Sequence, residues 1–293
     1  MTEFAQQIVN GLGTGSEYAL WAVGYGLVFQ VLGLMHFAHG DTLLIGLYIA
    51  WSLLVTLSFP IWIAFCLVIA AGGLLAAVVE RSVYRPLVKR NNPMAAFSAA
   101  LGAAYILRNI ATLGWGHDAK IFPRTLEGSS IHVGGAVFNT IPIIALAVTL
   151  TVVGLFTLFL RRHRWGQAIL MVAQDRTTAA LMGIPVYRVI SLVYVLSGMI
   201  GMIGALLYVG QFGALDPLVG LDITLKAFVA ALIGGLGRIG GAVLGGLLLG
   251  VMEALVIGYV SSLYSDAVVF GILAIIIVAR PQGLFGRVEE VKL

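Results

Sequence analysis

Two histidines and an aspartate stand close together early in the chain, in the segment His36-Phe-Ala-His39-Gly-Asp41. On a helix, His36 and His39 would lie on one face, and imidazole and carboxylate groups are common metal ligands. A metal site needs further ligands, and the sequence contains no other cluster of His or Cys. We therefore favour a turn or helix boundary here, with Asp41 as the N-cap of the following helix. The alternative is an intramembrane enzyme that uses these three side chains and retains a bound metal.

Three ionisable residues, Glu17, Arg108 and Glu253, stand inside long apolar segments. A charge inside a membrane is costly, so such residues are candidates for function. In the orientation derived below, Glu17 and Arg108 both lie toward the outer half of the membrane, where they would form an ion pair. The alternative is that each side chain extends to the membrane surface from a helix end. In a secondary transporter or channel that works alone, the three residues would form an ion relay.

The segment Gly235-Leu-Gly237-Arg-Ile-Gly240 has the G-x-G-x-x-G spacing of a dinucleotide-binding turn. That function requires a preceding strand and a βαβ unit, whereas both flanks here are apolar. We interpret these glycines as a tight turn between two membrane helices, with Arg238 at the lipid headgroups. The sequence also contains no G-x-x-x-x-G-K-[ST] motif for ATP and no common hydrolase motif. We therefore predict that the chain is not an enzyme and holds no cofactor of its own.

The elements that position these residues must be membrane helices. Of the 293 residues, 60% are hydrophobic and only 10% are charged, and the mean hydropathy is +1.03. Soluble domains are about 45–50% apolar and about 25% charged. The single cysteine, Cys66, excludes an intrachain disulfide, and the sequence offers no basic soluble module that would bind nucleic acid. The composition predicts an all-α, polytopic membrane protein surrounded by lipid.

A membrane-spanning helix needs about 20 mostly apolar residues, so the apolar runs give the predicted spans. Pro60 divides the longest run into two helices joined by a tight turn. The runs in the last third are short or interrupted, which is typical either of discontinuous helices beside a transport pathway or of a plain helical hairpin. We predict eight or nine transmembrane or re-entrant helices in a single domain, residues 1–293. The runs are 18–35, 42–79, 91–115, 141–160, 189–211, 223–236, 240–258 and 267–279.

The positions of Lys and Arg predict the orientation, because these residues favour cytoplasmic loops. They concentrate in two loops, at about 81–93 and 161–186, which we assign to the cytoplasm together with the C-terminus. The loop at about 116–140 has mixed charge and is assigned to the outer side. Three helices precede the first basic loop, so the N-terminus is predicted to lie outside.

The second basic loop contains an amphipathic segment, 165–182, whose apolar residues recur at roughly helical spacing. Gly183 and Pro185 end this segment. We predict one helix of about 15 residues at the membrane surface, because the segment is too polar to span the bilayer. It serves either as a surface anchor or as a docking element for a cytoplasmic partner.

Glycines recur four residues apart, at Gly11 and Gly15 and again at Gly246 and Gly250. Small residues let membrane helices approach closely, which holds them together where hydrophobicity does not. We predict packing faces, either within the chain or between subunits.

Five sequence blocks, in order along almost the whole chain, resemble the permeases of high-affinity branched-chain amino-acid ABC transporters, of the first-permease type. In one of them His36 stands where the family usually has Asn. The blocks are Asn10-Gly-Leu-Gly13 with Gly15-Ser-x-Tyr18-Ala-Leu20; Phe37-Ala-His39-Gly-Asp41; Ala173-Gln-Asp175-Arg176 through Ala180-Leu-Met-Gly183-Ile184-Pro185; Lys226-Ala-Phe228 through Gly240-Gly241-Ala; and Arg280-Pro-Gln-Gly283-Leu-Phe-Gly286.

The resemblance implies a transport subunit of an ATP-driven importer in the bacterial inner membrane. The chain would pair with a second homologous permease and with two ATP-binding subunits that hold ATP and Mg. An extracytoplasmic binding protein would deliver the substrate. The predicted docking helix would then couple the permease to the ATPase. The residues expected in this coupling loop are Gln174, Asp175, Arg176, Ala180, Gly183 and Ile184.

The resemblance also implies a substrate class. Leu, Ile and Val are the usual substrates, and the alternatives are urea, short amides, other amino acids or aromatic acids. A ligand with an ammonium and a carboxylate group needs polar partners or helix ends near the middle of the membrane. Alternatively, the path is lined mostly by small and apolar residues. The candidate pathway residues are Tyr18, Tyr25, His39, Gly234, Gly235 and Gly237.

Overall fold

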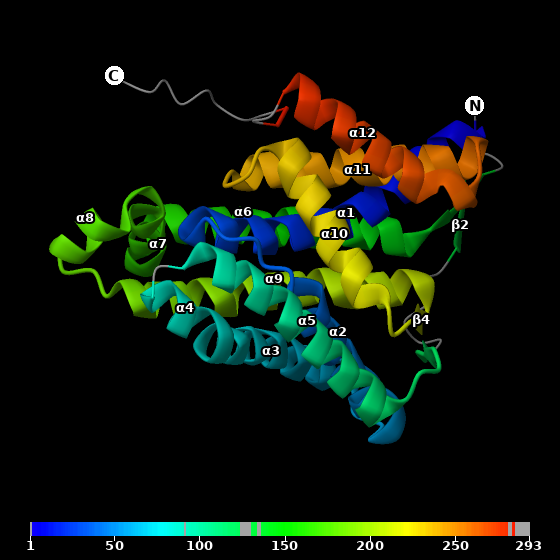
Figure 1. Cartoon of the computed structure of the whole chain (residues 1–293). Helices are drawn as coiled ribbons and strands as arrows, with labels where there is room; N and C mark the ends of the chain where they lie inside the picture. The colour runs from blue at the N-terminus through cyan, green and yellow to red at the C-terminus, as the bar shows by residue number, and fades with distance from the viewer. Residues whose placement is uncertain (1, 91, 124–129, 134–135, 281–282, 285–293) are drawn as a thin grey trace.

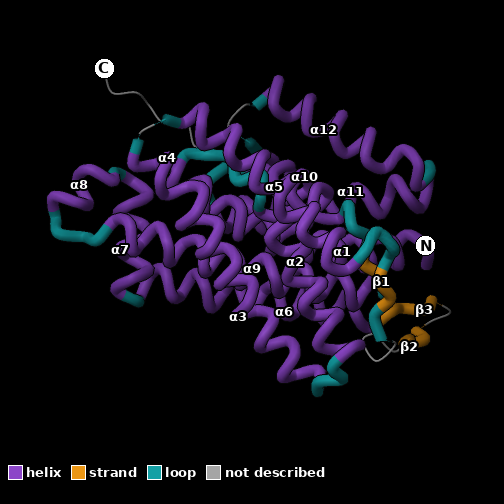
Figure 2. Tube along the Cα trace, turned by 60° about the horizontal axis from the view of Figure 1, so that its bottom comes forward, coloured by secondary structure: helices purple, strands orange, loops and turns teal. Residues whose placement is uncertain are grey.

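The computed structural model describes residues 2–90, 92–123, 130–133, 136–280 and 283–284. Most of these residues are helical, and the long helices run between two ends of one bundle (Figures 1 and 2). The helices are α1 (Thr2–Leu32), α2 (His39–Trp51), α3 (Ile61–Val79), α4 (Arg85–Lys89), α5 (Pro93–Trp115), α6 (Thr140–Arg162), α7 (Arg164–Gln174), α8 (Arg176–Leu181), α9 (Val186–Phe212), α10 (Val219–Gly234), α11 (Ile239–Tyr259) and α12 (Ser265–Ala279). Two π-helical segments, Ser52–Thr56 and Glu80–Tyr84, continue α2 and α3, and a 3-10 turn, Ser262–Tyr264, precedes α12. The described chain also has four short strands: β1 (Lys120–Ile121), β2 (Ser130–Val133), β3 (Ala136–Asn139) and β4 (Ala214–Leu215).

Six helical segments in the described chain are long and apolar enough to cross a membrane. They are His39–Thr56, Ile61–Lys89, Met94–Trp115, Thr140–Arg162, Val186–Phe212 and Ile239–Tyr259. The division at Pro60 is confirmed, because this residue directly precedes α3. The last third contains two shorter helices, α10 and α12, of 16 and 15 residues. The predicted all-α, polytopic membrane fold is therefore confirmed, although length and hydropathy alone identify six spans rather than eight or nine.

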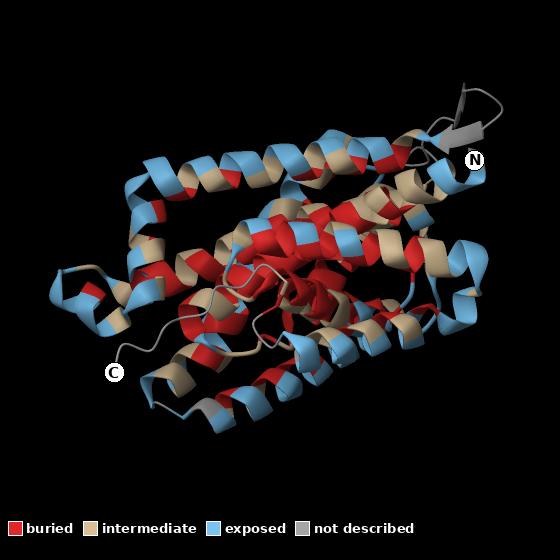
Figure 3. Cartoon of the chain, turned by 90° about the horizontal axis from the view of Figure 1, so that it is seen from above, coloured by how far each residue is buried: buried red, intermediate tan, exposed pale blue. Residues whose placement is uncertain are grey.

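Helix α1 lies in the centre of the bundle and packs against α6, α9, α10 and α11. It is 31 residues long and begins well before the predicted run, and every residue from 15 to 28 is buried. Figure 3 shows the buried residues gathered in the centre, with exposed faces on the surrounding helices. Because protein surrounds the middle of α1, its polar side chains are shielded from lipid and can meet partners on other helices.

The paired glycines join α1 to α11 within the chain. A Cβ atom added to Gly250 would lie 2.2 Å from the backbone nitrogen of Gly15, and one added to Gly246 would lie 2.4 Å from that of Ala19. Real Cβ contacts are never this close, so the two backbones touch only because side chains are missing there. The packing faces predicted from the glycine spacing are confirmed, and this pair of faces lies inside one subunit.

The loops divide between the two ends of the bundle as the sequence predicts. The N-terminus, the β2–β3 hairpin and the short β1–β4 pair lie at one end, whereas α4, α7 and α8 lie at the other (Figure 1). The two basic loops therefore share one end, opposite the loop of mixed charge. The assignment of the basic end and the C-terminus to the cytoplasm remains a prediction.

The glycine-rich segment between α10 and α11 forms the predicted turn. Gly235 and Gly237 have φ angles of +91° and +82°, which L residues with side chains rarely adopt. The C-terminal block packs on this turn, since the backbone N–H of Leu284 donates to the carbonyl of Ile233 at 2.8 Å. Helix α10, and not a strand, leads directly into this turn, so the dinucleotide-binding interpretation is excluded.

Candidate functional site

A polar cavity of about 600 Å³ lies toward the end of the bundle that carries the N-terminus. We call it the Lys226 pocket. It is formed by the first half of α1, the start of α6, the end of α9, the middle of α10 and the last third of α11. Amide and hydroxyl groups are frequent in its lining. The lining residues are Gln6, Gln7, Asn10, Thr14, Tyr18, Asn139, Pro142, Tyr208, Gln211, Phe212, Lys226, Glu253, Ala254 and Ile257.

Three side chains from three helices form a hydrogen-bonded cluster in the wall of the Lys226 pocket. The Lys226 ammonium donates to Glu253 Oε1 at 2.7 Å and to the Tyr18 hydroxyl at 2.9 Å. The Tyr18 hydroxyl donates in turn to Glu253 Oε2 at 2.7 Å. The side chains of Lys226 and Glu253 are only 19% and 9% exposed. A buried ion pair is a poor source of net stability, so a cluster of this kind in a pocket is a candidate binding site.

Tyr18 and Glu253 are separate candidates in the sequence, and the structure brings them together. Lys226, which provides the positive charge of the cluster, was not among the candidates predicted from the sequence. The available signal was that Lys226 is a cation between the apolar residues of a predicted membrane segment, 223–236. A charged residue at such a position is a candidate for function, for the same reason as Glu17, Arg108 and Glu253.

Glu17 is fully buried beside the cluster. Its carboxylate lies within electrostatic reach of Lys226 and Glu253, and neither of its oxygens has a hydrogen-bond partner among the described residues. The predicted ion pair between Glu17 and Arg108 is wrong. The two residues belong to different polar clusters, so a relay through Glu17, Arg108 and Glu253 is not supported.

Arg108 pairs instead with Asp41. The guanidinium donates from Nε to Asp41 Oδ1 at 3.0 Å and from Nη2 to Oδ2 at 3.1 Å. This two-point contact joins α5 to α2, and the Asp41 side chain is 1% exposed. The predicted N-cap role of Asp41 is also wrong, because α2 already begins at His39 and its N-cap residue is Ala38. The carboxylate points sideways to a cation on another helix rather than back to its own N-terminus.

Replacing Arg108 by Ala should lower the free energy of unfolding by about 3 kcal/mol, because it leaves the Asp41 carboxylate buried without its partner. The Arg108→Ala and Asp41→Ala effects should be non-additive by about 1–3 kcal/mol in the double variant. Chemical unfolding of the detergent-solubilised protein measures both quantities. The matched control combines Arg108→Ala with Glu17→Ala, and here we expect additivity. Coupling to Glu17 rather than to Asp41 would contradict the pairing.

Tyr25 and His39 lie in a second buried cluster and do not line the Lys226 pocket. The His39 ring contacts the rings of Tyr25 and His36, with centroids 6.2 and 5.6 Å apart. His36 Nδ1 lies 2.8 Å from the Tyr84 hydroxyl, in an edge-to-face contact of the two rings. In the part of the chain that the structure describes, no group of three or more His, Cys, Asp or Glu side chains is arranged to hold a metal. These aromatic and imidazole rings pack the region where the chain leaves α1 and enters α2.

The glycines proposed for the pathway also lie elsewhere. Gly234 packs against the carbonyl of Gly241, and a Cβ atom there would lie 2.0 Å from that oxygen. Gly235 and Gly237 form the turn between α10 and α11, at the end of the bundle opposite the N-terminus. Their role in the structure is the tight turn, and they do not line the Lys226 pocket.

The amphipathic segment forms two helices, α7 and α8, rather than the single helix predicted. Asp175 interrupts the helix with extended backbone angles, φ −156° and ψ 113°, and caps α8 by accepting from the backbone N–H of Thr177 at 2.8 Å. Its carboxylate also accepts from the Thr178 hydroxyl. Hydrogen bonds from Thr178, followed by that from Thr177, lower the pKa of the Asp175 carboxyl below its ordinary value. Asp175 therefore acts as an N-cap that sets the angle between the two helices.

Arg176 connects this segment to the central helix. Its Nε donates to the carbonyl of Val31 at 2.8 Å, in the last turn of α1, and burial lowers the pKa of its guanidinium. A cation at this position also suits the negative end of the α1 dipole. At the end of the segment two large apolar side chains are open, since Leu181 and Met182 are 83% and 71% exposed. Gly183, with φ +79°, then turns the chain toward α9, and Ile184 packs partly against the core.

Of the predicted coupling residues, Gln174 and Ala180 are exposed, whereas Asp175 and Arg176 are used within the chain. The sequence analysis did not single out Leu181 and Met182. The sequence contained a signal for their exposure, because two large apolar residues stand side by side directly before Gly183. Adjacent residues point in different directions on a helix, so at least one of the two lies off the apolar face.

Comparison with known proteins places these features in context. Residues 7–278 match the family described as branched-chain amino acid transport system, permease component. The chain is 36% identical over 302 residues to the high-affinity branched-chain amino acid transport system permease protein BraD of Pseudomonas aeruginosa, an alignment that covers 99% of this chain and 98% of that protein. It is 35% identical over 304 residues to the corresponding permease protein LivH of Escherichia coli K12, with the same coverage. A relative from Methanocaldococcus jannaschii, described as a probable branched-chain amino acid transport permease protein LivH, is 27% identical over 91% of this chain and 88% of its own length.

Proposed function

Since the chain belongs to the family of branched-chain amino acid transport system permease components, we propose that it is the membrane subunit of an ATP-driven importer for these amino acids. It is a multi-pass membrane protein, and we place it in the bacterial inner membrane with its C-terminus in the cytoplasm. A second homologous permease and two ATP-binding subunits complete the transporter, and an extracytoplasmic protein delivers the substrate. ATP and Mg bind to the partner subunits.

The observation that carries this proposal is the construction of α7 and α8. The segment presents Leu181 and Met182 outward and is tied to α1 by Arg176. Exposed apolar side chains at the end of a short, capped helix suit an apolar groove on a partner protein. We assign the ATP-binding subunit as that partner and the segment as the coupling element.

Helix α1 gives the segment a direct route to the Lys226 pocket. Val31, which Arg176 holds, lies on the same continuous helix as Tyr18 of the buried cluster. A displacement of α8 by the ATP-binding subunits would therefore move α1 against α10 and α11, which carry Lys226 and Glu253. Because packed helices shift as units, this movement would open and close the pocket.

The Lys226 pocket is the proposed substrate site. Lys226 would hold the carboxylate of an α-amino acid, Glu253 would hold its ammonium group, and the Tyr18 hydroxyl would orient both partners. One charge of each sign suits a zwitterion better than an anionic aromatic acid or an uncharged amide. The apolar side chain would lie against Phe212, Ala254 and Ile257 in the pocket wall.

Replacing both exposed residues, Leu181→Asp with Met182→Asp, should reduce ATP-driven uptake by at least about tenfold, since it places two charges in an apolar contact. Membrane insertion should be unchanged, because neither side chain packs in the core. Uptake of radiolabelled leucine into cells that express the complete transporter measures the first effect, and protein yield in membranes measures the second.

The exchange Leu181→Met with Met182→Leu keeps the apolar surface and serves as the control, for which we expect near-normal uptake. Normal uptake by the double aspartate variant would contradict the assignment of α8 as the coupling element.

A further inference from the structure

Glu17 lies on the face of α1 that packs against α9. Residues three or four positions apart share one face of a helix, and Thr14 and Trp21 flank Glu17 in this way. The Gln211 amide donates to the Thr14 hydroxyl at 2.8 Å, and the rings of Trp21 and Tyr208 contact each other with centroids 5.9 Å apart. Glu17 therefore stands between two contacts that join α1 to α9, and it is 0% exposed.

The polar atoms at this interface lack partners. Both carboxylate oxygens of Glu17, together with Gln211 Oε1 and Trp21 Nε1, are buried and have no hydrogen-bond partner among the described residues. Three of these four atoms are acceptors. A buried acceptor without a donor has lost its hydration without a replacement, which is costly. The interface therefore suits a small ligand that supplies hydrogen-bond donors.

The charges around Glu17 leave its carboxylate without a cation of its own. Lys226 of α10 is within electrostatic reach, but its ammonium already donates to Tyr18 and Glu253. Glu253 of α11 adds a second negative charge, and α9 faces Glu17 with Tyr208. The basic residues of α6, which packs on another face of α1, lie in its last turn. With both glutamates ionised, the group has one negative charge in excess, and a zwitterionic substrate does not cancel it.

One layer of side chains separates Glu17 from the Lys226 pocket. Its neighbours Thr14, Tyr18 and Tyr208 all line that pocket, and each carries a hydroxyl group. Because a hydroxyl both donates and accepts hydrogen bonds, these side chains can pass a proton from the pocket to the buried carboxylate. A larger cation would have to displace them.

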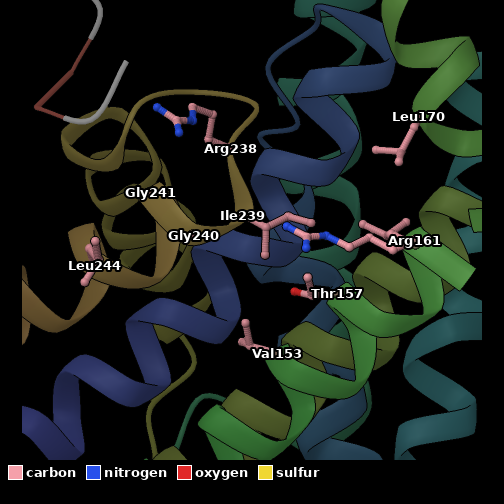
Figure 4. A pocket seen from close by; sticks show the side chains of 10 residues that line it. Val153, Thr157, Arg161, Leu170, Arg238, Ile239, Gly240, Gly241 and Leu244 are labelled. Atoms are coloured by element: carbon pink, nitrogen blue, oxygen red, sulfur yellow. The ribbon is translucent and has the colours of Figure 1, made fainter. Parts of the chain in front are cut away.

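A second cavity, of about 500 Å³, lies at the end of the bundle opposite the N-terminus, between α6, α7 and the start of α11 (Figure 4). Its charged lining residues are Arg161 and Arg238, and none of the described residues that line it is acidic. Positive charge at that end disfavours the approach of a proton. The Lys226 pocket, toward the N-terminal end, is therefore the favoured route to Glu17.

We propose that Glu17 is a proton-binding site that controls substrate binding in the Lys226 pocket. The inference rests on the proposed substrate site. With the proton bound, Glu17 is neutral and leaves the Lys226 ammonium to the carboxylate of the substrate. Without it, the negative charge of Glu17 attracts Lys226 and repels that carboxylate, so the substrate binds less tightly. Since the two binding events are linked, uptake should weaken as the pH rises.

Infrared difference spectroscopy of the purified transporter, with its partner subunits, tests the proton site independently of the substrate. A protonated carboxylic acid has a carbonyl stretch that a carboxylate lacks, so this band should disappear as the pH is raised. Glu17→Gln should remove the band at every pH. Glu3→Gln is the matched control, because it removes an exposed carboxyl group from the same helix and should leave the band unchanged.

ATP-driven leucine uptake into proteoliposomes, at leucine concentrations well below saturation, tests the control of the pocket. The ratio of the unmodified rate to the Glu17→Gln rate cancels the pH dependence of the partner subunits. This ratio should fall by up to about tenfold for each pH unit above the pH at which the infrared band disappears. Glu17→Asp keeps a titratable carboxyl group and should also show a fall, and Glu3→Gln should behave like the unmodified protein.

An infrared band that is absent from the unmodified protein, or that persists in Glu17→Gln, would overturn the proton site. A rate ratio that stays constant with pH would overturn its control of the pocket. If the band titrates and belongs to Glu17 but the unmodified transporter takes up no leucine at any pH, the proton site is supported and the proposed substrate is wrong.

Discussion

The double variant Lys226→Met with Glu253→Gln should fold in the membrane but lose amino acid uptake by at least about a hundredfold. Each charged hydrogen bond to the substrate contributes about 1.5–3 kcal/mol, and the loss of two such bonds accounts for this factor. The variant should fold because both charges are removed together. Either single variant breaks the pair in a site where Lys226 is 19% and Glu253 is 9% exposed, and should therefore also lower the yield of folded protein.

The matched control neutralises another ion pair of the membrane helices, Arg108→Met with Asp41→Asn. This pair joins α5 to α2 and does not line the Lys226 pocket, so uptake should fall much less than in the Lys226/Glu253 variant. Uptake is divided by the amount of folded transporter, which size-exclusion chromatography measures. This ratio separates an effect of the substitutions on substrate binding from an effect on folding. Normal uptake by the neutral Lys226/Glu253 variant would show that the pair only holds helices together.

Gly250→Val should prevent α1 and α11 from packing and leave little folded protein. Even the Cβ atom of the new side chain would lie 2.2 Å from the nitrogen and 2.3 Å from the Cα atom of Gly15. Both atoms belong to the backbone, so no side chain can rotate away and the helices must separate. We expect a loss of about 3 kcal/mol or more, a large part of the stability of an ordinary protein.

Gly154→Val on α6 is the control for the change in residue type, because a Cβ atom there would meet no heavy atom within 4 Å. Thermal unfolding of the solubilised proteins, followed by chromatography, compares the two. Similar melting temperatures for the Gly250 and Gly154 variants would contradict the close contact between α1 and α11.

Features that depend on local sequence could be predicted in advance. Pro60 fixes a helix boundary by its missing N–H and its restricted φ, and the turn between α10 and α11 requires positive φ angles at Gly235 and Gly237. The glycine spacing on α1 and α11 predicts close packing, although only the structure shows that these two faces pack on each other. Hydropathy identifies a membrane protein because each span needs a whole segment of mostly apolar residues to lie in lipid.

The pairing of charges could not be predicted in this way. Sequence reasoning joined Arg108 to Glu17 by estimated depth, whereas the angles and rotations of α2 and α5 bring Arg108 to Asp41. The same limit applies to Lys226, whose partners lie on α1 and α11. The depth of a residue in the membrane follows from its position along one helix. Which face of that helix contacts which neighbouring helix depends on how all the helices of the bundle pack.

The amphipathic segment shows a smaller failure of the same kind. Its apolar period continues past Asp175, so the pattern predicts one helix. Asp175 instead takes extended angles and caps a new helix, because its carboxylate bonds the N–H of Thr177 more favourably there than it could inside a helix. The sequence did contain a signal for this cap, a short polar residue followed after Arg176 by two threonines. The prediction of one helix gave more weight to the apolar periodicity.

Purification of this chain in mild detergent from its native membrane, with identification of the proteins that co-purify, distinguishes a subunit of an ATP-driven importer from a transporter that works alone. We expect a complex that contains a second permease and two ATP-binding subunits, and that loses the ATP-binding subunits when Leu181 and Met182 are replaced by Asp. After reconstitution, leucine uptake should require ATP. A stable, solitary protein that transports leucine in response to an ion gradient, without ATP, would contradict the account.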